Sequence, residues 1–164
     1  MARSKRGPEI HVDDSDVQVL FSALKNVQAD LRKNTNAQLR AAAKDCATAL
    51  RFDLYQAIPA SPAPQTALVA SSIKVKSDRT PVVTVGGTKR VGRAYKSRKG
   101  GTKRAVAGAL LWGVEYGDKH GRFAARNTNG HWIKPTVKRF GESSKAIDIY
   151  KRAVVDILKN AGVI

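Results

Sequence analysis

The sequence predicts an α+β fold in which long N-terminal helices and a C-terminal helix pack on a small antiparallel β-sheet, with a long basic loop. Three observations support this prediction. Apolar residues recur at helical spacing in the first third of the chain, β-branched residues form short runs near its middle, and the helical pattern returns at the end. The 164 residues suit a single domain over 15–164, preceded by a basic N-terminal arm over 1–14.

Two helices are expected in the first third of the chain. The first begins at the capping box Ser15-Asp16-Val17-Gln18, and Asn34 interrupts it. A second box, Thr35-Asn36-Ala37-Gln38, opens the next helix, whose apolar residues share one face: Leu39, Ala42, Ala43, Cys46, Leu50, Leu54 and Ala57. Cys46 lies on this apolar face, so we expect it to be buried as a small hydrophobic residue. It is the only cysteine, so no disulfide can form within the chain, and a reducing compartment is expected.

A proline-rich connector over 58–65 ends the second helix. Its prolines also interrupt an uncharged stretch, Leu54 to Ile73, that would otherwise look like a membrane span, so a soluble chain is expected. Beyond it, alternating residues over 72–76 and β-branched residues over 81–85 predict a β-hairpin with its turn at 77–80. For Ala107 to Tyr116 a short buried helix is favoured over a strand, and 117–130 reads as a loop.

The C-terminal region is expected to hold a last strand and a last helix. His131-Trp132-Ile133 reads as a strand that Pro135 stops. The helix that follows is capped by Ser143 or Ser144 and carries apolar residues on one face.

Positive charge is concentrated in the second half of the chain. The net charge is +17; residues 74–164 hold 21 basic and six acidic residues, against nine and seven in residues 1–73. The segment 86–106 contains no Asp or Glu, and its glycines predict a flexible basic loop. We expect such a loop to bind a polyanion or an acidic protein surface. The alternative is a solvated loop without a partner. Its cations are Lys89, Arg90, Arg93, Lys96, Arg98, Lys99, Lys103 and Arg104.

Little in the sequence indicates catalysis. The three histidines and the single cysteine have no recognised zinc-binding spacing, so neither a metal ion nor a cofactor is expected. Glu115 and Asp118 lie close together, which would suit a magnesium-dependent nuclease. A structural role for Glu115, paired with an arginine, is favoured, and no catalytic residue is expected.

Three segments together resemble a known family. They are Pro64-Gln65-Thr66-Ala67-Leu68-Val69-Ala70-Ser71-Ser72-Ile73, Leu111-Trp112-Gly113-Val114-Glu115-Tyr116-Gly117 and Trp132-Ile133-Lys134-Pro135-Thr136-Val137. In order, they are similar to the segments P-x-T-G-x-L-x-x-S-I, Y-A-x-x-V-E-x-G and P-F-L-x-P-A of the tail-component family of tailed phages. This family comprises the small neck, or head-to-tail connector, proteins of siphophages, and the resemblance covers roughly residues 17–160.

The resemblance implies a non-enzymatic virion protein that forms a ring between portal and tail tube and assembles in the host cytoplasm. It implies as partners copies of itself, the adaptor, stopper and tail terminator proteins, and genomic double-stranded DNA in the channel, but no membrane. The alternative is a free, non-specific nucleic-acid-binding protein. It would explain the positive charge, but it ranks second because it does not explain the order of the motifs. A nuclease using Glu115 and Asp118 ranks third.

Overall fold

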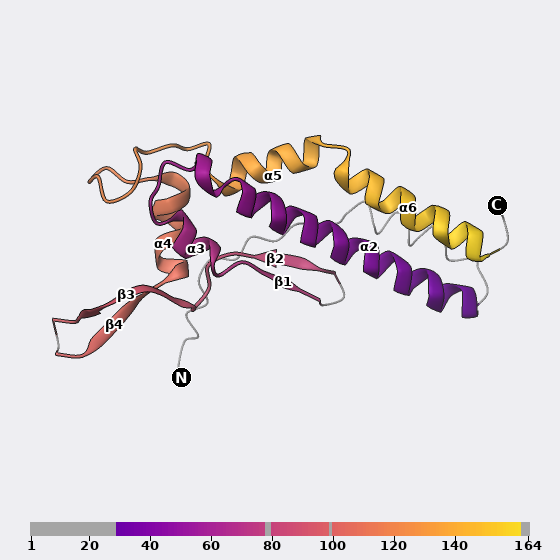
Figure 1. Cartoon of the computed structure of the whole chain (residues 1–164), viewed down its shortest axis with the longest axis horizontal. Helices are drawn as coiled ribbons and strands as arrows, with labels where there is room; N and C mark the ends of the chain where they lie inside the picture. Colours follow the sequence, from indigo (N-terminus) through magenta and orange to yellow (C-terminus); the bar gives the residue numbers. More distant parts are fainter. Residues whose placement is uncertain (1–28, 78–79, 99, 162–164) are drawn as a thin grey trace.

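The computed structural model describes residues 29–77, 80–98 and 100–161 and confirms the α+β class (Figure 1). The long helix α2 (Ala29–Gln56) forms the spine, and α5 and α6 lie along one side of it. The short elements α3 and α4 gather at one end, where a β-hairpin projects from the body. The remaining elements are η2 (Ile58–Ala60), α3 (Thr66–Ala70), β1 (Lys74–Lys76), β2 (Val82–Thr84), β3 (Arg90–Lys96), β4 (Thr102–Val106), α4 (Ala107–Tyr116), α5 (Ile133–Glu142) and α6 (Lys145–Asn160).

The core forms against the apolar stripe of α2, as predicted. Leu50 is 1% exposed, and Leu54 and Cys46 are also buried. Burial of this stripe removes apolar surface from water, which is the main favourable term in folding. Its partners come from every other layer of the fold: Val69, Ile73, Val83, Val85, Leu111, Val114, Trp132, Ile133 and Phe140.

The strands form two separate two-stranded antiparallel ribbons within the described residues, where the sequence predicted one small sheet. The predicted hairpin over 72–85 is confirmed as β1 paired with β2, with Val75 opposite Val83. The second ribbon, β3 with β4, occupies the segment predicted as a loop. The predicted helix over 107–116 is confirmed as α4.

The predicted helix break at Asn34 is wrong. Helix α2 continues through Asn34 and Thr35, and Thr35 is buried in the helix rather than capping its start. One exposed Asn costs a helix only some tenths of a kcal/mol, roughly, which tertiary packing along a long helix outweighs. The first capping box, Ser15 to Gln18, lies outside the described residues.

The predicted strand at His131-Trp132-Ile133 is also wrong, because Ile133 begins helix α5. Pro135 does not stop this helix. It is the third residue of α5, where a backbone N–H would have no partner within the helix, so proline is tolerated there. Thr136 closes the first turn, since its N–H donates to the carbonyl of Trp132 at 3.3 Å.

The C-terminal helix begins after Ser144, one of the two predicted cap residues. The Ser144 hydroxyl donates to the carboxylate of Asp148 at 2.8 Å, so it satisfies a side chain instead of a backbone amide. Two side chains form long-range bonds that join α2 to the C-terminal region. Trp132 Nε1 donates to the Leu54 carbonyl at 2.8 Å, and Lys145 Nζ donates to both carboxylate oxygens of Asp53 at 2.7 Å.

Replacing Leu50 with Ala should lower the free energy of unfolding by about 3 kcal/mol, because the substitution leaves a cavity beneath α2. The matched control is Phe52→Ala on the same helix, where the side chain is 60% exposed and the expected change is within about 0.5 kcal/mol. Urea denaturation of both variants measures the difference. Equal losses at the two positions would contradict this placement of the core.

Candidate functional site

The acid-free basic segment is a β-hairpin, which corrects the prediction of a flexible loop. Strand β3 pairs with β4 in antiparallel register, with Arg90 opposite Val106 and Lys96 opposite Thr102. The turn closes where Ser97 N donates to the Gly101 carbonyl at 2.7 Å. The glycines that suggested a linker are turn and bulge residues, and Gly100 has a φ of +87° that other residues rarely adopt.

The base of this basic hairpin (residues 89–106) is fixed to the body of the protein. Ala107 N donates to the Lys89 carbonyl at 2.8 Å, and Gly108 N donates to the Gly87 carbonyl at 3.0 Å. Val91 is buried, while the backbone of Gly92 passes close to Leu68 of α3. The hairpin is therefore held by the start of α4 and by α3 at its base, and its far end extends into solvent (Figure 1).

The register distributes the cations over both faces of the hairpin. Successive side chains on a strand point to opposite faces, and paired residues share a face. Arg90, Lys96 and Arg104 accordingly lie on one face, and Lys103 lies on the other beside its partner Tyr95. Arg93 falls in an irregularity of β3 between Val91 and Tyr95.

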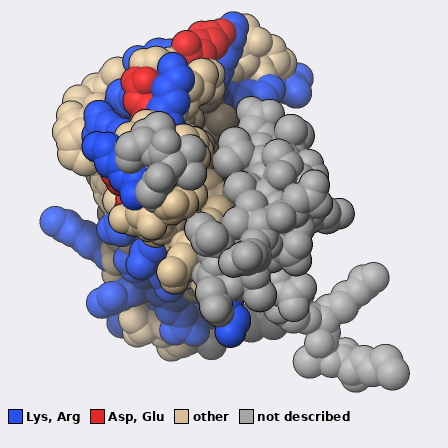
Figure 2. Space-filling view, turned by 90° about the vertical axis from the view of Figure 1, so that its right-hand side faces the viewer, with Lys and Arg blue, Asp and Glu red and all other residues tan. Residues whose placement is uncertain are grey.

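The cations of the hairpin lie on its surface. Every described member of the predicted set is exposed, from Lys89 to Arg104; Lys99 lies outside the described residues. Lys89 donates to the Ser71 carbonyl, and no ion pair joins a hairpin cation to a carboxylate in the described ranges. Figure 2 faces the end of the molecule opposite the hairpin and shows that Lys and Arg side chains are spread over that surface too, with Asp and Glu only in small patches. Uncompensated positive charge of this kind attracts polyanions.

Glu115 has a structural role, although its partners are backbone amides and not the arginine that was expected. It is 3% exposed and belongs to α4. Its carboxylate accepts hydrogen bonds from the N–H groups of Ile133 at 2.7 Å and Lys134 at 2.8 Å. These are the first two residues of α5, so Glu115 places a negative charge at the positive end of the helix dipole. A Cβ at Gly130 would collide with Glu115 Oε1, which explains the glycine there.

Asp118, the other candidate ligand of the nuclease hypothesis, and the histidine His131 also bind backbone groups. Asp118 Oδ1 accepts from the amides of His120, Arg122 and Phe123 at 3.3, 3.1 and 3.4 Å, and so shapes the loop after α4. The His131 ring is 2.7 Å from the Ala125 carbonyl. Among the described residues, no group of three or more His, Cys, Asp or Glu side chains gathers in a way that could hold a metal ion.

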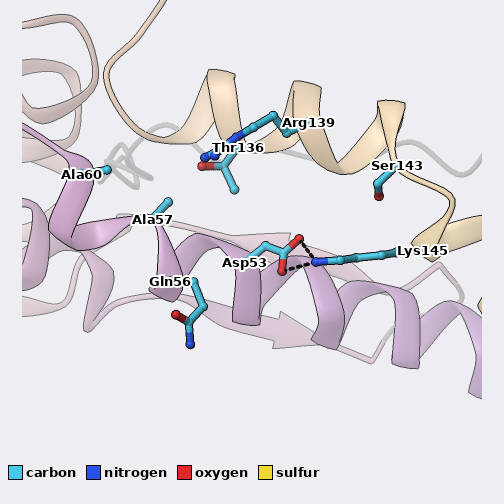
Figure 3. Close-up of a pocket in the computed structure, with 8 residues that line it drawn as sticks. All are labelled: Asp53, Gln56, Ala57, Ala60, Thr136, Arg139, Ser143 and Lys145. Carbon is cyan, nitrogen blue, oxygen red and sulfur yellow. Dashed lines mark hydrogen bonds and ion pairs between the residues drawn. The ribbon is translucent and has the colours of Figure 1, made fainter.

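A hollow of about 330 Å³ lies between α2 and the α5–α6 corner. Figure 3 shows Asp53 and Lys145 pointing toward one another across it, with Arg139 and Thr136 on α5 and Gln56 turned away. The Asp53 and Lys145 charges bind each other, and Arg139 Nε donates to the Pro135 carbonyl at 3.4 Å. The Asp53–Lys145 ion pair of this hollow joins α2 to α6, and the Arg139 bond stays within α5.

Sequence reasoning missed one surface feature of α4, the exposed Trp112 stacked on the half-buried Tyr116. Their rings stack with centroids 5.2 Å apart and planes at 25°. The signal was present, since residues four apart on a helix lie on the same face. It was overlooked because the segment 107–116 was treated as wholly buried.

Comparisons with protein-family models, curated proteins and solved structures find no match to this chain. None of the helices within the described ranges is both long enough and apolar enough to cross a membrane.

Replacing Glu115 with Ala should lower the free energy of unfolding by roughly 2 kcal/mol, because the buried N–H of Ile133 and the part-buried N–H of Lys134 lose their acceptor. Glu142→Ala is the matched control. Glu142 is exposed and pairs only with Lys138, at 3.8 Å, so a change within about 0.5 kcal/mol is expected. Denaturant unfolding followed by circular dichroism measures both values, and a neutral effect at Glu115 would refute the capping role.

Proposed function

We propose that the chain is a structural virion protein of a phage neck, one subunit of a ring in the head-to-tail connector between portal and tail tube. In this proposal the basic hairpin contacts the phosphates of DNA in the channel or an acidic surface of a neighbouring connector protein. The observation that carries the proposal is the hairpin itself: its described cations are exposed, lack acidic partners and extend from a fixed base.

The three family-like segments support the structural part of the proposal, because their side chains hold the subunit together. Thr66 is buried, and its hydroxyl lies 2.7 Å from that of Ser61. Glu115 joins α4 to α5. Trp132 bonds to the backbone of α2. Residues with these roles maintain a scaffold, which is what a ring subunit requires.

Ring symmetry would multiply the effect of the hairpin. Each subunit of a closed ring presents the same surface, so every copy adds its cations around one duplex. Phosphate contacts fix position without reading sequence, and this suits DNA of any sequence in a channel. The hairpin offers Arg and Lys side chains for such contacts.

The triple variant Arg93→Gln, Lys96→Gln, Arg104→Gln should weaken binding to duplex DNA and reduce its salt dependence. Each lost phosphate contact lowers the slope of log K against log salt by about 0.9, so the slope should fall by up to about 2.7. Fluorescence anisotropy with a labelled duplex at several salt concentrations measures the slope.

The matched control removes the same charge elsewhere, through Lys151→Gln, Arg152→Gln and Lys159→Gln on the exposed side of α6. Its slope should stay close to that of the unmodified chain. Equal slopes in the two triple variants would mean that net charge alone, and not the hairpin, determines binding. Tight duplex binding by a chain that is absent from virions would favour the free nucleic-acid-binding protein.

In phage particles, the hairpin variant should leave heads that lose DNA or fail to acquire tails, because the proposed contact lies at the neck. The α6 variant should assemble normally. Electron microscopy of particles and measurement of packaged DNA, after each variant complements a deletion of the gene, test this expectation. Normal titre and normal genome retention with the hairpin variant would overturn the proposed role.

A further inference from the structure

Helix α4 carries an aromatic platform, made of the exposed Trp112 and the half-buried Tyr116 on which it stacks. Trp112 is 59% exposed, although its large apolar ring would gain from burial. One face of its ring stacks on Tyr116. Exposed Trp and Tyr side chains on a rigid element are characteristic of binding surfaces.

The aromatic platform is held in place at both ends of α4. At the N-terminal end, Ala107 bonds to Lys89 at the base of the basic hairpin. At the C-terminal end, the Glu115 carboxylate binds α5. Lys134, in the first turn of α5, places its Nζ 5.5 Å from the centroid of the Tyr116 ring. A ligand therefore meets rings that are already positioned, which lowers the entropic cost of binding.

The surroundings of the aromatic platform are positive. Lys134 lies over the Tyr116 ring. Arg126 is held near the end of α4, because the N–H of the next residue, Asn127, donates to the Tyr116 carbonyl at 2.9 Å. The nearest carboxylates along the chain, Glu115 and Asp118, accept hydrogen bonds from backbone amides. Aromatic rings among cations are complementary to a ligand that combines flat rings with negative charge, and nucleic acid has both.

We propose that Trp112 stacks on an unpaired base of a nucleic acid strand whose phosphates lie on the basic hairpin. The inference rests on the proposed function for the phosphate contact and adds to it a preference for single strands or open duplex ends. Bases inside a duplex are stacked on both faces, so only an unpaired base can cover the indole.

The two sites are close enough for one short strand. Helix α4 continues directly from β4, and Trp112 lies six residues beyond Val106, a rise of about 9 Å. A strand that leaves the hairpin thus reaches the aromatic platform within a few nucleotides. The hairpin binds single and double strands alike through phosphates, whereas Trp112 distinguishes between them.

Tryptophan fluorescence of the full chain tests the inference. The only other tryptophan, Trp132, is 1% exposed and bonded to Leu54, so Trp112 dominates any response to a ligand. Titration with an oligo-dT single strand should quench the emission, and a duplex of the same length should not. Trp112→Ala should weaken single-strand binding about tenfold and leave duplex binding unchanged. Trp112→Phe, which keeps a ring, should retain part of the affinity.

The outcomes separate this inference from the proposed function. If Trp112→Ala binds oligo-dT as the unmodified chain does, while the hairpin triple variant weakens both ligands, stacking is refuted and the polyanion contact stands. If the hairpin variant binds both ligands normally, the phosphate contact fails and the inference fails with it. A response of Trp112 to a Glu-rich peptide but not to oligo-dT would also overturn the inference, because it would identify an acidic protein surface as the occupant.

Discussion

A buried carboxylate on α4 joins the helix at the base of the basic hairpin to the C-terminal helices. Glu115 accepts the first two N–H groups of α5, Pro135 has no N–H to satisfy, and Thr136 closes the turn. The backbone positions of the first four residues of α5 are thereby accounted for. Through this bond α5 and α6 are fixed relative to α4, and α4 in turn fixes the base of the basic hairpin. Without the Glu115 carboxylate, the start of α5 would lose its side-chain bonds to α4.

In this arrangement, the residues that stabilise the fold are different from those proposed to bind a partner. The apolar core lies along α2, far from the hairpin strands, and the described hairpin cations contribute no ion pairs to the fold. Substitutions in the hairpin are therefore expected to change the interaction with a partner while leaving the fold intact. Repulsion among the like charges of the hairpin raises its free energy, and this repulsion decreases when phosphates or carboxylates approach.

Local patterns predicted those elements whose residues interact with near neighbours in sequence. The stripe from Leu39 to Leu54, the β1–β2 hairpin and the bounds of α4 followed from periodicity and β-branched runs. The failures have long-range or backbone causes. The strand expected at His131 became a helix start because Glu115 caps it from 18 residues away. The basic loop became a ribbon because glycines with positive φ accommodate its turn and bulge. The aromatic platform was missed because the segment 107–116 was read as a buried helix, although Trp112 is exposed.

Lysine acetylation footprinting, read by mass spectrometry with and without duplex DNA, tests the central claim most directly: the basic hairpin is the surface that meets a polyanion. Lys96 and Lys103 lie on opposite faces of the hairpin, and Lys151 and Lys159 lie on α6. The account predicts that DNA protects the two hairpin lysines and leaves the α6 lysines reactive. Equal protection of all four, or protection of the α6 lysines alone, would contradict it.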